Sequence, residues 1–312
     1  MRDLLDKRLV FVTGKGGVGK STVSLALGLA AARRGKRAIV CEISSQEHAS
    51  RVLHRAEVGY HEVEIADGLW TISIDPDQAM REYVLLQVKV RAMRDLLFRT
   101  PIFTYLAAAT PGLRELVTIG KIWELALEDR KVKKGRSYDL VIVDAPATGH
   151  GIGFLETPRT FARIARVGPM HAQAEALDSF ICNHRRTGVV LVALPEEMPV
   201  NESALLEQRL GEEVGVAIDR VYMNALYPER FSDSDAEILA RAINGDSAPP
   251  ALSQAAEGAI RAALSQHRRS LSQRRQLARL REQVTTPVST LPFVFKPELG
   301  MAELESLADQ VI

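Results

Sequence analysis

Residues 14–22 read Gly14-Lys15-Gly16-Gly17-Val18-Gly19-Lys20-Ser21-Thr22, and they directly follow the apolar run 9–12. The stretch satisfies the pattern G-x-x-x-x-G-K-[ST] in full, through Gly14, Gly19, Lys20 and Ser21. A strand-like run before the motif and an apolar helical run, 23–32, after it supply the strand–loop–helix context that the pattern requires. The segment therefore predicts a phosphate-binding loop.

Each residue type in this loop has a chemical role at the phosphates of a nucleotide. Glycines let the backbone turn tightly, so that its amides point inward and the following helix aims its positive end at the same phosphates. We expect Lys20 to pair with the β- and γ-phosphates, Ser21 to ligate Mg²⁺ and Thr22 to contact the α-phosphate. The predicted nucleotide-binding residues of the loop are Gly14, Lys15, Gly16, Gly17, Val18, Gly19, Lys20, Ser21 and Thr22.

Apolar strand-like runs alternate with helical runs along most of the chain. The run 9–13 precedes a helix over 21–34, for which Gly35 is the stop signal. This alternation predicts a single α/β domain over 1–312, a doubly wound, mostly parallel sheet of the phosphate-loop NTPase type. Ligands of such sheets bind at the carboxyl ends of the strands. The further strands are expected at 37–41, 70–74, 139–143, 188–194, 217–223 and 288–291.

Two helical regions depart from the alternation. The segment of about 75–135 is expected to be a helical subdomain inserted between strands, with breaks at Pro101 and at Pro111-Gly112. Packing on the sheet and a surface for a partner or client protein explain its apolar faces equally well. A long basic helix is expected over about 249–284. A solvated face explains its arginines better than a nucleic-acid groove does, because aromatic side chains that stack on bases are missing.

Composition limits the class of protein. The 312 residues are 46% hydrophobic, enough for one large domain, and the formal net charge of +1 points neither to nucleic acid nor to a membrane surface. No apolar stretch is long enough to span a bilayer, and residues 1–7 contain acids that a signal peptide would lack. The two cysteines, Cys41 and Cys182, predict no disulfide framework and no cysteine-based zinc site. The expected location is the cytoplasm.

A second nucleotide motif follows the expected strand 139–143. Asp144 ends this apolar run and is followed by a flexible turn, 145–150, that contains glycine and threonine. An aspartate in this position can hold Mg²⁺ through its water shell, and the turn can sense the γ-phosphate. We therefore expect Ser21 and Asp144 to form the magnesium site, and Lys20 and Asp144 to be catalytic residues.

The extra lysine of the loop, Lys15, resembles the first lysine of the deviant phosphate loop of the ParA/MinD, nitrogenase iron protein and ArsA-type ATPases. In those families this lysine reaches across a dimer interface to the nucleotide of the partner. The resemblance implies that Lys15 is a further catalytic residue and acts in trans, so that closure of a dimer depends on bound nucleotide.

The segment 144–150 resembles the switch II of the ArsA/guided-entry ATPases, which are also called anion-transporting ATPases. The resemblance runs over most of the chain, and the chain resembles the bacterial, single-domain members of that family. Residues 194–202 are similar to the P-E-x-x-x-x-x-E loop of that family, and 112–116 to its P-G-x-x-E segment. The resemblance implies ATP and Mg²⁺ as ligands and ATP hydrolysis as the activity. It assigns Asn224 to the adenine, whose ring edge an amide can meet with a donor and an acceptor. Pro292 and Phe293 match the late turn that packs on the base.

The chain also departs from the family pattern. Ser44 aligns with the switch I aspartate that positions the attacking water, and serine activates water poorly without a neighbouring base. Glu42 or Glu47 can substitute, although Glu42 can equally be a magnesium-shell residue. The C-x-x-C pair of the eukaryotic targeting dimers and the thiols of the arsenite pumps are missing, and the insert has only Met80 and Met93. Hydrolysis is therefore expected to be slow.

Three functional hypotheses follow. The first is an ATP-dependent dimeric switch that couples its nucleotide state to a client or partner protein through the helical insert. The second is a regulatory subunit that binds nucleotide, hydrolyses it poorly and pairs with a related active ATPase, an alternative that Ser44 motivates. The third and weakest is a ParA-like ATPase that positions nucleic acid with the late basic helix. Since the chain has one phosphate loop, dimerisation requires a second chain.

Overall fold

A single eight-stranded sheet organises the chain in the computed structural model, which describes residues 3–43, 58–87, 110, 112–130, 136–165, 167–244 and 252–311. The strand order is β3-β4-β2-β5-β1-β6-β7-β8, and every neighbouring pair is parallel except β3 with β4. The strands are β1 (Leu9–Gly14), β2 (Ala38–Glu42), β3 (Val63–Ala66), β4 (Leu69–Ser73), β5 (Leu140–Asp144), β6 (Thr187–Ala193), β7 (Arg220–Leu226) and β8 (Val288–Pro292).

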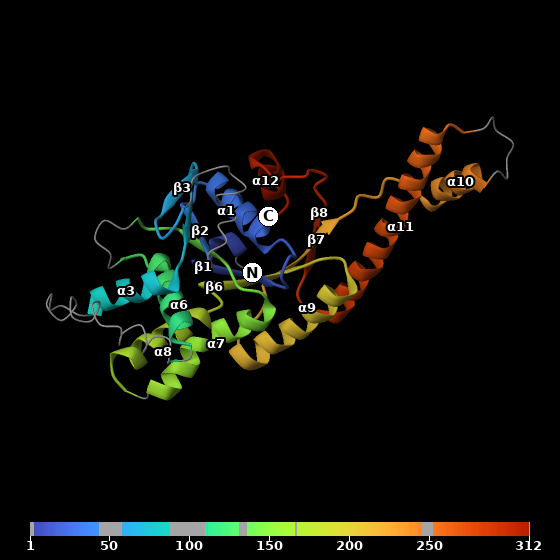
Figure 1. Cartoon of the computed structure of the whole chain (residues 1–312). Coiled ribbons are helices and arrows are strands. Elements are labelled where there is room, and N and C mark those ends of the chain that lie inside the picture. The colour runs from blue at the N-terminus through green and yellow to red at the C-terminus, as the bar shows by residue number, and fades with distance from the viewer. Residues whose placement is uncertain are drawn as a thin grey trace.

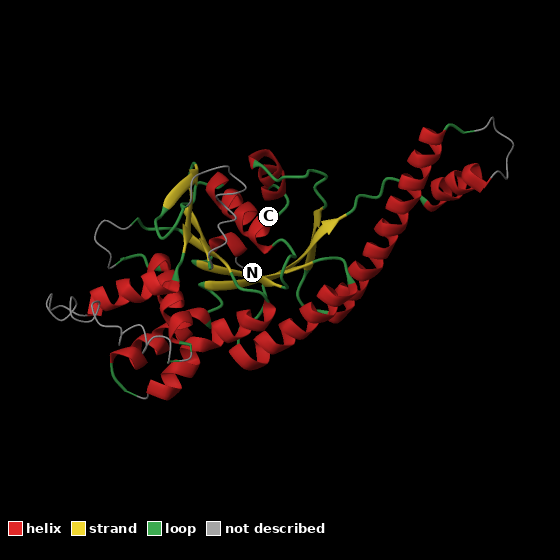
Figure 2. Ribbon diagram, in the orientation of Figure 1, coloured by secondary structure: helices red, strands yellow, loops and turns green. Residues whose placement is uncertain are grey.

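The central strands are apolar and buried on both faces, as a parallel sheet between two helix layers requires. Two separate clusters of buried side chains lie on the two faces of the sheet. Helices α1 (Lys20–Arg33) and α12 (Met301–Ala308) pack together over one face, and the other face is covered by α6, α7 and α9 (Figures 1 and 2). These and the neighbouring helices are α6 (Leu113–Ala126), α7 (Thr148–Ala165), α8 (Pro169–Ile181) and α9 (Glu197–Arg209).

The structure confirms the predicted fold class and the predicted strands, whose bounds shift by one to three residues. Gly35 stops α1 as expected, with a φ of +76° and a hydrogen bond of 2.8 Å from its amide to the Ala32 carbonyl. The short strand β3 was not predicted. It forms a hairpin with β4 through Asp67-Gly68, and the φ of Gly68 is +74°. The remaining short elements are the 3₁₀ turn η1 (Leu4–Asp6) and the π-helical turn η2 (Leu210–Val214).

Within the expected insert 75–135, the structure describes two helices, α3 (Pro76–Gln87) and α6, which pack against each other. The breaks at Pro101 and Pro111 and the methionine Met93 lie outside the described residues. None of the described helices is both long enough and apolar enough to cross a membrane.

The long helix α11 (Gln254–Gln283) falls in the range 249–284 and projects from the sheet layer, with α10 (Asp233–Asn244) packed along its outer half (Figure 1). Its inner half packs on α9 and β7 and is partly buried through Leu277 and Leu280. Its exposed residues include Arg261, Arg268 and Arg275, which are seven positions apart and therefore share one face of the helix. We call α10 and α11 together the arm.

Candidate functional site

The glycine-rich loop lies between the end of β1 and the start of α1, at the middle of the sheet. Gly14 ends β1 with a φ of +147°, and a Cβ on it would lie 2.2 Å from the Val192 carbonyl oxygen of β6. Gly19 is the N-cap of α1 with a φ of +94°, and a Cβ there would lie 2.3 Å from Asn224 Nδ2. Both positions require glycine, because a side chain would meet both an unfavourable backbone and a neighbouring strand.

The two other glycines, Gly16 and Gly17, form the open rim of the loop. A Cβ on either would meet nothing within 4 Å, whereas Val18 is buried with 1% of its surface exposed. The loop is thus anchored at Gly14, Val18 and Gly19 and open between them, at the positive end of α1. This is the geometry in which loop amides can hold phosphate oxygens.

Ser21 and Asp144 meet directly beneath the loop. The Ser21 hydroxyl on the first turn of α1 donates a hydrogen bond of 2.5 Å to Asp144 Oδ2 at the end of β5. Hydroxyl and carboxylate oxygens are ligands that Mg²⁺ prefers. The two residues predicted for the magnesium site therefore lie together and fit that ion.

Lys20 lies in the same place. Its ammonium group donates a 3.0 Å hydrogen bond to the Lys15 carbonyl, so the side chain folds back onto the loop. Burial lowers the pKa of Lys20, and the nearby carboxylate of Asp144 opposes that shift. A half-buried ammonium group at this position is suited to pair with phosphate oxygens, whose charge compensates its desolvation.

A second carboxylate stands beside Asp144. Glu42 ends β2, the strand next to β5, and the register pairs Glu42 with Asp144 across the two strands. Only 2% of the Glu42 surface is exposed. The structure therefore places one of the two proposed substitutes for the switch I aspartate next to the magnesium-site residue. Ser44 and Glu47 lie outside the described residues.

Lys15, the second lysine of the loop, points to α9 in the single chain. Its ammonium group lies 2.8 Å from Glu202 Oε1, and the two side chains are 38% and 33% exposed. The preceding residue, Asn201, accepts a 2.8 Å hydrogen bond from Arg279 of α11, which also forms a 3.7 Å ion pair with Glu197. The loop, α9 and the arm are thus connected through side chains.

Asn224 contacts the loop from the end of β7. Its Nδ2 donates a 2.9 Å hydrogen bond to the carbonyl of Val18, and Ala225 follows with a φ of +59°. Gln273 of α11 holds this turn in place by accepting a 2.7 Å hydrogen bond from the Tyr227 amide and donating one of 3.4 Å to the Ala225 carbonyl. The amide predicted to meet adenine therefore also supports the phosphate loop.

Pro292 and Phe293 lie at the end of β8, the edge strand next to β7. Pro292 ends β8 opposite Leu226, and the Phe293 amide donates a 2.8 Å hydrogen bond to the Leu226 carbonyl. Phe293 joins Tyr227 and Phe295 in a cluster of rings with centroids 4.8–5.4 Å apart. Phe293 is 37% exposed, so part of an aromatic face is open to solvent.

The structure thus brings together the loop residues, Asp144 and Asn224, and places Pro292 and Phe293 on the same edge of the sheet. Thr22 follows Ser21 on the first turn of α1. The pairing of Lys15 with Glu202 was not predicted, nor were the two contacts from α11. A charge pair 187 residues apart leaves no periodic signal in a sequence, although Glu202 already stood in the quoted segment 194–202.

Comparisons with known proteins agree with this geometry. The family model described as anion-transporting ATPase matches residues 7–168. The chain is 32% identical over 248 residues to the ATPase BagA of Mycobacterium tuberculosis, an alignment that covers 77% of this chain and 70% of that protein. It is 26% identical over 247 residues to a putative arsenical pump-driving ATPase of Halobacterium salinarum, covering 73% of this chain and 37% of that protein.

A eukaryotic relative extends the same similarity. The chain is 23% identical over 277 residues to the ATPase GET3 of Podospora anserina, and the alignment covers 75% of this chain and 79% of that protein. The family model spans more than half of the chain and includes both the glycine-rich loop and Asp144. The chain therefore belongs to the anion-transporting ATPase family.

Proposed function

We propose that the protein is an ATP-binding, Mg²⁺-dependent dimeric ATPase switch that couples its nucleotide state to the binding of a client or partner protein. The observation that carries this proposal is the 2.5 Å contact between the Ser21 hydroxyl and Asp144, directly under the open glycine loop and beside Lys20. Residues from a loop, a helix and a strand meet at this point, which is where an open α/β sheet binds its ligand.

In this proposal different residues contact the phosphates, the Mg²⁺ ion and the adenine of ATP. The amides of 14–19 and the Lys20 ammonium hold the β- and γ-phosphates, and Thr22 contacts the α-phosphate. Ser21 and Asp144 hold Mg²⁺, which neutralises phosphate charge when it is bound. Asn224 meets the adenine, and Pro292 and Phe293 pack on it. Asp144 links the phosphates to the switch segment 145–150, so that gain or loss of the γ-phosphate changes that segment.

Lys15 acts in trans in this proposal. In the dimer it leaves Glu202 and reaches the nucleotide of the partner, so that closure requires ATP. Hydrolysis is slow because Ser44 replaces the expected switch I aspartate. Glu42, beside Asp144 at the end of β2, is the described carboxylate best placed to assist the attacking water.

A hydrolysis-poor regulatory subunit is the second candidate function, and the serine at position 44 favours it. In that case the chain binds ATP, but turnover occurs in a related active subunit with which it pairs. The proposed client surface is the helical insert, of which α3 and α6 are described. A ParA-like role on nucleic acid remains the weakest alternative and has only the exposed arginines of α11 in its favour.

ATP binding with and without Mg²⁺ tests the proposal, followed by steady-state turnover. We expect Lys20→Ala and Ser21→Ala to lose Mg²⁺-dependent binding of ATP. The matched controls, Lys296→Ala and Ser272→Ala, change exposed residues outside the loop and should keep ATP binding. Unchanged binding in Lys20→Ala would refute the site. Binding without turnover would favour the regulatory subunit over the enzyme.

Light scattering with a non-hydrolysable ATP analogue tests the dimer. A shift from monomer to dimer with the analogue supports the homodimeric switch. A strict monomer under both conditions excludes the homodimer and calls for mixing with a related ATPase chain.

A further inference from the structure

A cavity of about 360 Å³ lies between α3, α6 and α8, apart from the phosphate loop. A smaller hollow of about 20 Å³ shares Tyr83, Val117, Gly120 and Gln173 with it, so the two adjoin along α6. None of the residues predicted to bind the nucleotide lines either space. The walls combine apolar groups (Ala79, Val117, Leu127), aromatic rings (Tyr83, Trp123) and charged groups (Glu82, Lys121, Glu124).

Gly120 opens this space. It sits in the middle of α6, where glycine costs about 1 kcal/mol relative to alanine. A Cβ on Gly120 would meet nothing within 4 Å, so close packing does not require glycine there. The residue lines both hollows, and any larger side chain at this position would project into them. The absence of a side chain at Gly120 therefore adds space to both hollows, at a position where glycine is unfavourable for the helix.

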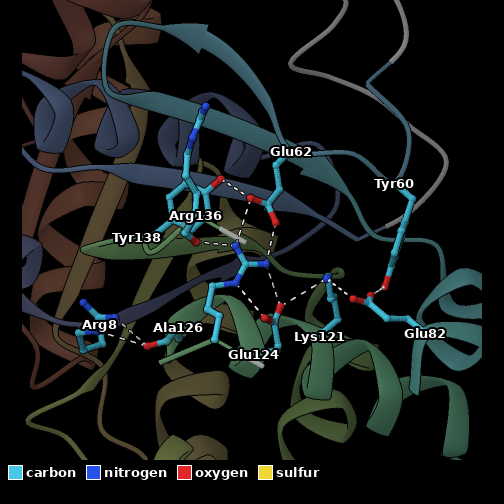
Figure 3. Close-up of polar contacts among 10 residues, drawn as sticks. Arg8, Tyr60, Glu62, Glu82, Lys121, Glu124, Ala126, Arg136 and Tyr138 are labelled. Carbon is cyan, nitrogen blue, oxygen red and sulfur yellow. Dashed lines mark hydrogen bonds and ion pairs between the residues drawn. The ribbon is translucent and has the colours of Figure 1, made fainter. Parts of the chain in front are cut away.

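An ionic cluster forms the inner wall. Lys121 lies 2.8 Å from Glu82 and 3.4 Å from Glu124, and Arg130 pairs with Glu124 at 2.8 Å and with Glu62 at 2.7 Å (Figure 3). The side chains of Lys121 and Arg130 are only 8% and 3% exposed. Three carboxylates face two cations, which leaves one negative charge in excess among these five residues.

Arg130 stays charged within this cluster. Burial opposes the charged form of Arg130, but hydrogen bonds and ion pairs with Glu124 and Glu62 outweigh burial and raise its pKa. The Lys121 ammonium is shared between two carboxylates and lies 5.5 Å from the centre of the Tyr60 ring. It is therefore already neutralised and is not available to an anion. Among the charged groups that line the cavity, two carboxylates, Glu82 and Glu124, stand against one ammonium group, Lys121, and this balance favours a cation over an anion.

The remaining wall groups suit an organic cation. Tyr83 and Trp123 supply aromatic faces, which bind ammonium groups through their quadrupole. Gln173 of α8 also lines the cavity and adds an amide that can donate or accept a hydrogen bond.

We propose that the cavity between α3, α6 and α8 binds a small organic cation, an amine or quaternary ammonium compound with an apolar or aromatic body. The ammonium group sits at Glu82 and Glu124, and the body fills the space that Gly120 leaves open. This site shares no residue with the nucleotide site proposed above and does not depend on it, although α3 and α6 also belong to the proposed client surface.

Isothermal titration of the full chain without nucleotide tests the proposal. The probes are 2-phenylethylamine and benzyltrimethylammonium, with 2-phenylethanol and phenylacetate as the neutral and anionic counterparts. We expect both cations to bind at least about tenfold more tightly than either counterpart, in line with an ion pair and a desolvated cation–π contact. Lack of binding by both cations, or equal binding of cation and alcohol, would overturn the proposal.

Two variants locate the binding. Gly120→Leu places a side chain in the cavity, leaves every charged residue of the cluster unchanged and should abolish binding. Gly258→Leu, at an exposed position on α11, should not. Glu82→Gln should weaken the binding of both cations about tenfold and leave the binding of the alcohol unchanged. Glu298→Gln makes the same change of charge on an exposed loop and should change neither affinity. Full binding by a folded Gly120→Leu protein would show that the cations bind elsewhere.

Discussion

The Lys15 ammonium lies 2.8 Å from Glu202 Oε1 in the same chain, although the family resemblance assigns this lysine to the nucleotide of a partner. In the free chain α9 therefore holds the lysine that the proposed dimer requires. Both side chains are about one-third exposed, so the pair contributes at most about 1 kcal/mol. In the proposed dimer such a contact would oppose closure only weakly, because phosphates of a bound nucleotide would offer Lys15 a stronger partner.

Removing the carboxylate of Glu202 is therefore expected to favour the ATP-bound dimer. Glu202→Gln should tighten self-association with a non-hydrolysable ATP analogue by up to about 30-fold, because closure breaks one pair of up to about 1 kcal/mol in each of the two subunits; sedimentation equilibrium at low salt measures it. The gain should shrink at high salt, where the exposed pair is already screened.

Glu128→Gln is the control, since Glu128 is exposed and is not part of this contact. Adding Glu202→Gln to Lys15→Ala should produce no gain, because the lysine to be released is gone. A gain of the same size in the Lys15→Ala background would mean that Glu202 acts on something other than this lysine.

Asn224 is expected to matter before any nucleotide binds. Asn224→Ala removes the donor to the Val18 carbonyl and leaves a buried acceptor, which should lower the free energy of unfolding by about 1–3 kcal/mol in urea without nucleotide. Gln310→Ala, which removes an exposed amide, should stay within about 0.5 kcal/mol. The adenine role makes a separate prediction, a smaller ratio of ATP to GTP affinity in Asn224→Ala. An unchanged ratio would leave this residue with a structural role alone.

The ionic cluster predicts a loss of stability in acid. Burial alone would raise the pKa of Glu62, but hydrogen bonds from Arg130 and Tyr138 and the nearby cations lower it below its ordinary value. A lowered pKa in the folded state contributes stability above the unfolded pKa of about 4.3, and that stability is lost as the pH falls through the folded value. Glu62→Gln should therefore be less stable than the original chain at neutral pH, and the difference should shrink below about pH 4. Urea unfolding across this range measures it, and a difference that grows in acid would contradict the assignment.

The two thiols are expected to react very differently. Burial raises the pKa of both, but Cys41 is completely buried in β2, whereas Cys182 is half-buried at the end of α8. An aromatic disulfide reagent should label Cys182 slowly in the native protein and both cysteines in denaturant, because thiolate formation and access limit the rate. Cys182→Ser should then show no native labelling. Labelling of Cys41 at the rate of Cys182 would mean that β2 opens in the native state.

The elements with a strong local pattern could be predicted from sequence. Continuous apolar runs predict the buried central strands. The loop motif, together with the assumption of a parallel sheet, predicts that Lys20 and Ser21 lie near Asp144, and Ser21 is hydrogen-bonded to Asp144 in the structure. The edge strand β3 escaped because it is short and half-exposed, although the Asp67-Gly68 pair between β3 and β4 is itself a hairpin signal.

The contacts between distant surfaces could not be predicted in this way. Arg130, for example, lies in a loop without periodicity, and its two carboxylate partners come from positions 62 and 124. Nothing in the sequence brings these three together until β3, α6 and the loop after α6 are folded. The same holds for Gln273 and Arg279, whose partners lie on β7 and α9.

The arm has a mechanical consequence. Helix α11 is 30 residues long, so it extends for ~45 Å, and its inner half is fastened at Gln273 to the turn after Asn224 and at Arg279 to the helix that carries Glu202. The part of the helix beyond Gln273 extends for about 29 Å to Gln254, so a tilt of about 5° at the attachment displaces its tip by ~2.5 Å. The outer end of α11 therefore moves further than the residues at its attachment. A pair of spectroscopic labels, one of them at this end, would measure small rotations near the phosphate loop as a larger change in distance.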